Sequence, residues 1–206
     1  MLIFNSYHKW IKQILKKTQK KKIFNFLILL LIGVLFFRRL LAMQNTSYQI
    51  YGVTGLDDIK TIARETADKY QYGANRDNLY KMLLETAIVE TDAGNAYMDT
   101  NRNYGRSIMQ FDKVGYNEAL RIRAAKGNTD YQNEVNQGYM SDTLQRNPRF
   151  AMYLARFYYL GKSKPIPSTL EERANYWKTY YNSIYGAGTP EKYINLVKKH
   201  LGKDWK

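Results

Sequence analysis

The sequence predicts an all-α fold with an N-terminal transmembrane helix, on the basis of three observations. Apolar side chains recur at helical spacing in segments that are bounded by Gly, Pro and capping residues. Alternating apolar and polar runs never exceed a few residues, so strands are limited to a minor hairpin expected between Ala93 and Arg106. An apolar run follows a lysine-rich N-terminus. With 206 residues, of which 45% are hydrophobic, the chain can form one packed domain and a tail.

The apolar run near the N-terminus is the predicted membrane anchor. It extends from Ile23 to Phe37, and such a helix reaches only about 22 Å, short of the roughly 30 Å hydrocarbon core. Continuing the helix to Met43 gives a sufficient length, because the stems of Arg38 and Arg39 can extend to the headgroups. We favour a transmembrane anchor over a cleaved secretory signal, since no small-x-small cleavage site follows, and over a basic interfacial helix.

The charge is unevenly distributed, which predicts orientation and partners. Residues 1–43 hold nine Lys or Arg and no Asp or Glu, within a net charge of +14. This bias places the N-terminus on the cytoplasmic side, or its equivalent, and the domain across the membrane. The remaining residues have a modest basic excess, which suits an anionic surface such as a cell wall and equally a plain soluble surface. The predicted organisation is a basic tail at 1–22, an anchor at 23–43, a linker at 44–56 and a helical domain at 57–206.

The composition also excludes several kinds of site. The chain has no cysteine, so disulfides, thiolate metal sites and thiol catalysis are excluded. His8 and His200 lie near opposite termini without ligand-like neighbours, so we expect no metal ion or other cofactor and no Ser-His-Asp triad. The basic tail lacks a groove-reading helix or an aromatic-basic repeat, so nucleic acid is not an expected partner.

Capping and stop signals divide the domain into helices. Asn147-Pro148 is the clearest start, with Asn as the cap and Pro at the first helical position. A capping box can begin at either Ser168 or Thr169, and Thr189 precedes the last helix. The expected helices cover residues 57–70, 77–90, 114–125, part of 130–146, 149–160, 170–184 and 190–201.

One acidic residue is placed for acid catalysis. Glu90 follows the apolar residues Ala87, Ile88 and Val89 and precedes a turn. An apolar setting raises the pKa of a carboxyl group, so that it can donate a proton near neutral pH. Glu85 is the alternative acid on the same helix. It lies in the middle of that helix on a different face, where a packing or salt-bridge role is expected.

Three segments together resemble one enzyme family. Glu90-Thr91 is followed by Gly105-Arg106-Ser107-Ile108-Met109-Gln110 and, later, by Tyr180-Tyr181-Asn182 and Tyr185-Gly186-Ala187-Gly188. This pattern resembles the lytic transglycosylases, which have a goose-lysozyme-like fold. Gln110-Phe111-Asp112 and residues 170–194 are similar to the phage virion-associated branch. The resemblance covers residues 77–200.

The chain departs from the family pattern at three places. Thr91 replaces the usual Ser, and Ser107-Ile108 replaces Gly-Leu. An insertion leaves Tyr181 or Tyr185 as the cleft tyrosine, of which we favour Tyr181.

The resemblance implies an activity that needs a single carboxylate. Glu90 would protonate the bond between N-acetylmuramic acid (MurNAc) and N-acetylglucosamine (GlcNAc) in peptidoglycan. Glu90 would then activate the muramic 6-hydroxyl and give a 1,6-anhydro end. The residues expected to bind substrate are Thr91, Ser107, Met109, Gln110, Tyr181, Asn182 and Tyr185.

Two alternatives remain open at this level. If water attacks instead, the enzyme is a hydrolytic muramidase, and Asp99 or Asp112 would supply the second carboxylate. The chain could also be a catalytically inactive, membrane-anchored protein that binds the cell wall.

For the favoured function, the expected partners are peptidoglycan glycan strands, a lipid membrane and other virion membrane proteins. The expected location is single-pass in a virion membrane, or in a host inner membrane with the domain facing the periplasm, for a role in cell entry.

Overall fold

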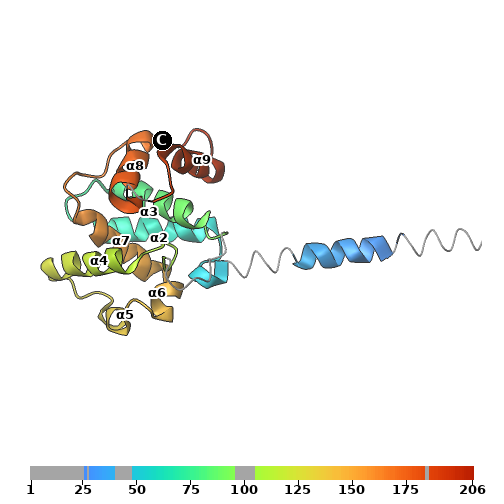
Figure 1. Ribbon diagram of the computed structural model, residues 1–206, viewed down its shortest axis with the longest axis horizontal. Coiled ribbons are helices and arrows are strands. Elements are labelled where there is room, and N and C mark those ends of the chain that lie inside the picture. The colour runs from blue at the N-terminus through green and yellow to red at the C-terminus, as the bar shows by residue number, and fades with distance from the viewer. Residues whose placement is uncertain (1–25, 27, 40–47, 96–104, 184–185) are drawn as a thin grey trace, which may run out of the picture. The chain divides into compact units, whose positions relative to one another are not determined.

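The computed structural model describes residues 26, 28–39, 48–95, 105–183 and 186–206 (Figure 1). The chain divides into two units, Met1–Gln44 and Asn45–Lys206. In the first unit, residues 28–39 are helical and their side chains are exposed. No helix within the described residues is long and apolar enough to cross a membrane. The basic tail and both ends of the predicted anchor lie outside the described residues, so the anchor at 23–43 stays a prediction.

The second unit is all-α in the part of the chain that the structure describes. No strand forms among those residues, and an isolated antiparallel bridge joins Arg106 and Phe111. Residues 96–104 of the expected hairpin lie outside the described ranges. The elements are α2 (Leu56–Lys69), α3 (Arg76–Thr91), α4 (Lys113–Ala125), α5 (Gln132–Gln137), α6 (Asp142–Arg146), α7 (Pro148–Leu160), α8 (Leu170–Trp177), the π-helix η1 (Lys178–Asn182) and α9 (Pro190–Leu201).

Helix α7 is at the centre of the unit. Its start is as predicted, because the Asn147 side chain accepts a hydrogen bond from the Phe150 amide at 3.0 Å and Pro148 occupies the first turn. Every residue from Phe150 to Phe157 is buried. A helix that is buried on all sides must have neighbours on all sides, and α7 packs against α2, α3, α4 and α6 (Figure 1).

Helix α3 is the second buried helix and carries Glu90 near its C-terminal end. Asn75 caps its first turn by accepting hydrogen bonds from the amides of Asp77 and Asn78, each at 3.0 Å. All residues from Met82 to Ile88 are buried. The helix packs against α2, α7 and α9, so its C-terminal end is fixed within the core rather than on a mobile surface (Figure 1).

The structure differs from the sequence-based expectation in three segments. Residues 130–146 form two short helices instead of one. The helix expected over 170–184 widens into η1 after Trp177 and ends at Asn182. The described part of the expected linker, residues 48–56, is packed against the domain, because Tyr51 and Val53 belong to the hydrophobic core with 1% and 3% exposure.

Candidate active site

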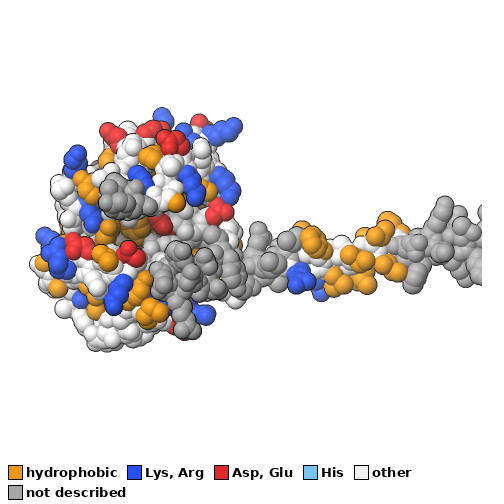
Figure 2. Space-filling model, in the orientation of Figure 1, with side chains coloured by type: hydrophobic (Ala, Val, Ile, Leu, Met, Phe, Trp, Pro, Cys, Tyr) orange, Lys and Arg blue, Asp and Glu red, His pale blue; other side chains and the backbone are white. Residues whose placement is uncertain are grey.

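A groove of about 520 Å³ lies between α4, α7 and η1, and the end of α3 reaches it (Figure 2). Figure 2 shows hydrophobic and acidic side chains in the hollowed part of this face. Polar and aromatic groups meet in the groove, as is common in sites that bind small molecules or sugars. The lining residues are Glu90, Gln110, Phe111, Asp112, Val114, Gly115, Glu118, Tyr158, Lys162, Tyr180, Tyr181, Asn182 and Ser183.

Glu90 is the perturbed carboxyl group of this groove. Burial raises the pKa of Glu90 to about 7, while the hydrogen bond from Trp177 and the positive charge of Lys192 lower this pKa less strongly. The indole Nε1 of Trp177 donates to Oε1 of Glu90 at 2.9 Å. A carboxyl group with a pKa near neutrality can donate a proton and later take one back.

The residues that follow Glu90 end α3 and fix the position of its carboxyl group. The Thr91 hydroxyl donates to the Ala87 carbonyl at 2.8 Å and accepts from the Gly94 amide at 2.9 Å. Asp92 takes the left-handed conformation at φ 48°, and its amide donates to the Ile88 carbonyl. Thr91 is fully buried, so its hydroxyl shapes the turn beneath the groove.

Glu85 is enclosed in a structural network. Arg173 forms a buried bidentate pair with it, with N···O distances of 2.8 and 2.7 Å. The Tyr193 hydroxyl donates to Glu85 Oε2 at 2.9 Å, and the Trp205 indole donates to Glu85 Oε1 at 2.6 Å. Because both oxygens are engaged and Glu85 is fully buried, the expected salt-bridge role of Glu85 is confirmed.

The turn from Arg106 to Phe111 forms the wall of the groove beside Glu90. Ser107 and Gln110 have positive φ values of 68° and 47°. The Gln110 side-chain amide donates to the Ser107 carbonyl at 2.7 Å, which closes the turn. Gly105 is required here, because a Cβ atom would lie 2.2 Å from the Gln110 carbonyl oxygen. This turn directs Gln110 and Phe111 toward the groove.

Tyr181 joins the π-helix to this turn. Its hydroxyl donates to the Met109 carbonyl oxygen, and its ring lies 5.3 Å from the ring of Tyr158 and 6.0 Å from that of Phe111, centroid to centroid. Burial raises the pKa of Tyr181 well above its usual value, so the hydroxyl keeps its proton and acts as a donor. Asn182 lines the same groove, and its Oδ1 accepts from the Lys178 ammonium at 3.0 Å.

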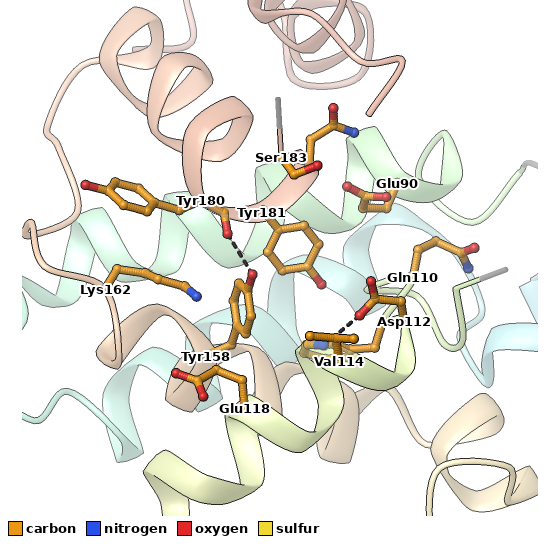
Figure 3. Close-up of a pocket in the computed structure, with 13 residues that line it drawn as sticks. Glu90, Gln110, Asp112, Val114, Glu118, Tyr158, Lys162, Tyr180, Tyr181 and Ser183 are labelled. Atoms are coloured by element: carbon orange, nitrogen blue, oxygen red, sulfur yellow. Dashed lines mark hydrogen bonds between the residues drawn. The ribbon is translucent and has the colours of Figure 1, made fainter. Parts of the chain in front are cut away.

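The structure brings together five of the residues that the sequence analysis selected. Figure 3 shows Glu90, Gln110 and Tyr181 around one space, and Asn182 and Asp112 also line it. Ser107 and Met109 are fully buried, as Thr91 is, and lie outside the lining. Tyr185 and Asp99 lie outside the described residues. The substrate-binding roles of all these residues stay predictions.

Several groove residues were not selected from the sequence. Trp177 contacts Glu90 although 87 residues separate them. Its position four residues before Tyr181, on the same side of a helix, was the available signal. Tyr158, Glu118 and Lys162 also line the groove, and no motif marked them. Within the described part of the chain, no three His, Cys, Asp or Glu side chains gather closely enough to hold a metal ion.

Comparison of the chain with protein-family models, curated proteins and solved structures finds no match. The function is therefore inferred from the geometry and electrostatics of the groove.

Proposed function

We propose that this chain is a peptidoglycan lytic transglycosylase with a lysozyme-like domain, which cleaves the MurNAc–GlcNAc bond and leaves 1,6-anhydro-muramic ends. The observation that carries the proposal is the state of Glu90. Its carboxyl group lines a groove of glycan-compatible size, and burial raises its pKa to about 7. A carboxyl group at this pKa is divided between acid and base at neutral pH, and a transglycosylase needs both forms in turn.

The proposed reaction uses Glu90 twice. Because Oε1 accepts the hydrogen bond from Trp177, Oε2 is the oxygen that carries the proton toward the substrate. Glu90 donates this proton to the glycosidic oxygen, and the bond from that oxygen to C1 of the muramic sugar breaks. The 6-hydroxyl oxygen of the same sugar then bonds to C1, and its proton returns to Glu90. Neither water nor a cofactor is consumed.

The other groove residues support binding of a sugar chain. Tyr158 and Tyr180 contribute amphipathic aromatic side chains to the lining, a kind of side chain that suits contact with sugars, and the Lys162 ammonium covers one face of Tyr158. Gln110 and Asn182 offer amide groups that can pair with hydroxyl and N-acetyl groups. Tyr181 links the π-helix to the Met109 carbonyl and so holds the two walls at a fixed separation beside Glu90.

Hydrolysis is the second candidate, because another carboxylate lines the same groove. Asp112 lines the groove together with Glu90 and Gln110 (Figure 3). Its Oδ1 accepts from the Gly115 amide at 2.6 Å as the cap of α4, which leaves Oδ2 to orient a water molecule. A hydrolytic muramidase would use such a pair of acids. An inactive protein that binds the cell wall is the non-enzymatic alternative.

Peptidoglycan zymography with matched variants tests the proposal. We expect the wild type to clear the gel and Glu90→Gln not to clear it. Glu171→Gln, which changes an exposed acid at the start of α8, is the matched control and should clear the gel like the wild type. Equal clearing by wild type and Glu90→Gln would overturn the assignment of Glu90. Mass analysis of the products separates the two reactions, since an anhydro end lacks one water.

The cellular setting is a further part of the proposal. We place the domain across a membrane from a cytoplasmic or equivalent N-terminus, in a virion membrane or a host inner membrane, where it opens peptidoglycan during phage entry. The support is the basic tail at 1–22 and the apolar run that follows it. Protease protection of a C-terminal tag in sealed membrane vesicles tests this orientation.

A further inference from the structure

A second hollow, of about 370 Å³, adjoins the groove. The two share Lys162, which lines both. The second hollow lies between residues 72–78 and the end of α7 with the loop that follows it. Figure 3 shows Lys162 and Tyr180 on the opposite side of Tyr181 from Glu90, so the shared lysine marks the end of the groove away from the acid.

The second hollow is strongly basic. Three cationic side chains line it, those of Arg156, Lys162 and Lys164, and no Asp or Glu is among its described lining residues. Arg156 is 2% exposed and uses its guanidinium to donate to the carbonyls of Tyr70 and Gln71, so its charge is held in place without a carboxylate partner in the described structure. Such a hollow favours an anionic ligand.

Lys162 itself lacks an anionic partner. Its Nζ lies 3.4 Å from the centroid of the Tyr158 ring, and this ammonium group forms no ion pair or hydrogen bond with another described residue. Lys162 is partly buried, and this burial lowers the pKa of its ammonium group, against a smaller opposing effect of Glu118. A partly desolvated ammonium without a counter-ion is less stable than a paired one, and a ligand carboxylate placed there would provide the missing charge-assisted hydrogen bond.

Neutral groups around the cations suit a peptide. Asn78 lines the hollow with its amide, which donates to the Ile166 carbonyl at 3.2 Å and keeps its own oxygen as an acceptor. Tyr72 contributes a ring that is 42% exposed. A peptide presents amide donors to such acceptors and carboxylates to the lysines. A simple inorganic anion would use only the cations.

We propose that this hollow, which we call the basic annex, binds the acidic stem peptide of the muramic sugar whose glycosidic bond lies at Glu90. The identity of the peptide rests on the proposed function. In peptidoglycan the stem is attached to the muramic sugar and carries free carboxylates, so a strand in the groove can reach Lys162 with its peptide. The annex therefore selects glycan strands that still bear peptides over strands from which peptides have been removed.

Binding of a free stem peptide tests the annex without catalysis. The full chain carrying Glu90→Gln, in detergent, is titrated with the tetrapeptide L-Ala-γ-D-Glu-diaminopimelate-D-Ala by isothermal calorimetry. Lys162→Gln and Lys164→Gln are each expected to weaken binding about tenfold, the loss of one charge-assisted contact. Lys203→Gln, an exposed lysine outside the annex, is the matched control and should bind as the parent does. No binding, or binding that these two annex variants do not weaken, overturns the proposal.

A second measurement separates this inference from the proposed function. The rates of wild type and Lys164→Gln are compared on peptide-bearing strands and on strands stripped by an amidase. If the annex binds the stem peptide, the rate on peptide-bearing strands divided by the rate on stripped strands should be about tenfold lower in Lys164→Gln than in the wild type. An unchanged ratio rejects the annex while the enzyme activity stands. If the wild type is inactive on both kinds of strand but still binds the peptide, the proposed enzymatic activity is rejected and the peptide-binding site stands.

Discussion

The indole Nε1 of Trp177 donates a hydrogen bond of 2.9 Å to Oε1 of Glu90 and so links the end of α8 to the end of α3. The bond restrains the rotation of the carboxyl group and leaves Oε2 without a hydrogen bond to another described residue. It also favours the ionised form of Glu90, in opposition to burial. Trp177 is therefore a positioning residue that restrains the proposed catalytic group and lowers its pKa against the larger effect of burial.

Trp177→Phe removes this bond and retains most of the ring that packs against Tyr193. We expect the pKa of Glu90 to rise further, because the bond lowers it, and the alkaline limb of the kcat/KM pH profile to move up by roughly half a unit to one unit. The rate should fall about tenfold or more through loss of orientation. A lower rate with an unshifted pH profile would indicate that Trp177 acts only in packing.

Glu90→Gln is expected to change stability in a pH-dependent way. The pKa of Glu90 in the folded state, about 7, exceeds the value of 4.5 for a free side chain, so the fold favours the protonated form. Ionisation therefore destabilises the wild type progressively as pH rises from about 4.5 to 7. The Gln variant escapes this cost, so its free energy of unfolding relative to wild type should increase by about 1–3 kcal/mol between pH 4.5 and pH 8. Urea denaturation at the two pH values measures it, and equal differences at both would contradict the raised pKa.

Glu85→Gln should have the opposite effect on stability. It leaves the buried guanidinium of Arg173 without its carboxylate, at a cost of about 3–5 kcal/mol. Thermal unfolding by circular dichroism measures the loss. The double variant Glu85→Gln/Arg173→Met should be more stable than Glu85→Gln alone, because the unpaired charge is gone. If the single variant unfolds at the wild-type temperature, the pair does not hold α3 to α8.

Tyr181→Phe and Tyr185→Phe form a matched pair for the tyrosine that lines the groove. Removing the Tyr181 hydroxyl breaks its bond to the Met109 carbonyl, and we expect a fall in kcat of about tenfold with a loss of stability of about 1 kcal/mol. Tyr185→Phe should keep at least half of the wild-type kcat. A larger loss in Tyr185→Phe would reverse the preference between the two tyrosines.

Local signals in the sequence account for most of the fold. The starts of α7 and α9 follow from Asn147-Pro148 and Thr189-Pro190, whose side chains and rings act within one turn of the chain. The capping box at α8 uses Thr169, whose hydroxyl lies 2.8 Å from Glu172, so structure selects between the two possible registers. Such short-range preferences can be recognised without knowledge of the tertiary structure.

The site was predictable only in part, because its chemistry depends on long-range packing. The apolar residues before Glu90 indicated a raised pKa, and its position in the groove agrees with that expectation. The contacts of Trp177 with Glu90 and of Tyr181 with Met109 join residues more than 70 positions apart, and no periodicity encodes them. The widening of the helix after Trp177 places Asn182 in the groove, and no propensity rule predicts a π-helix there.

The partners of Glu85 have a consequence for synthesis of the chain. The carboxylate is made early, and its partners Arg173, Tyr193 and Trp205 follow 88, 108 and 120 residues later. Until they emerge from the ribosome, α3 carries an acid that cannot be buried without a large free-energy cost. The helix that bears Glu90 can therefore dock in its final position only after α8, which carries Arg173, has emerged, so assembly of the cleft follows the synthesis of both helices.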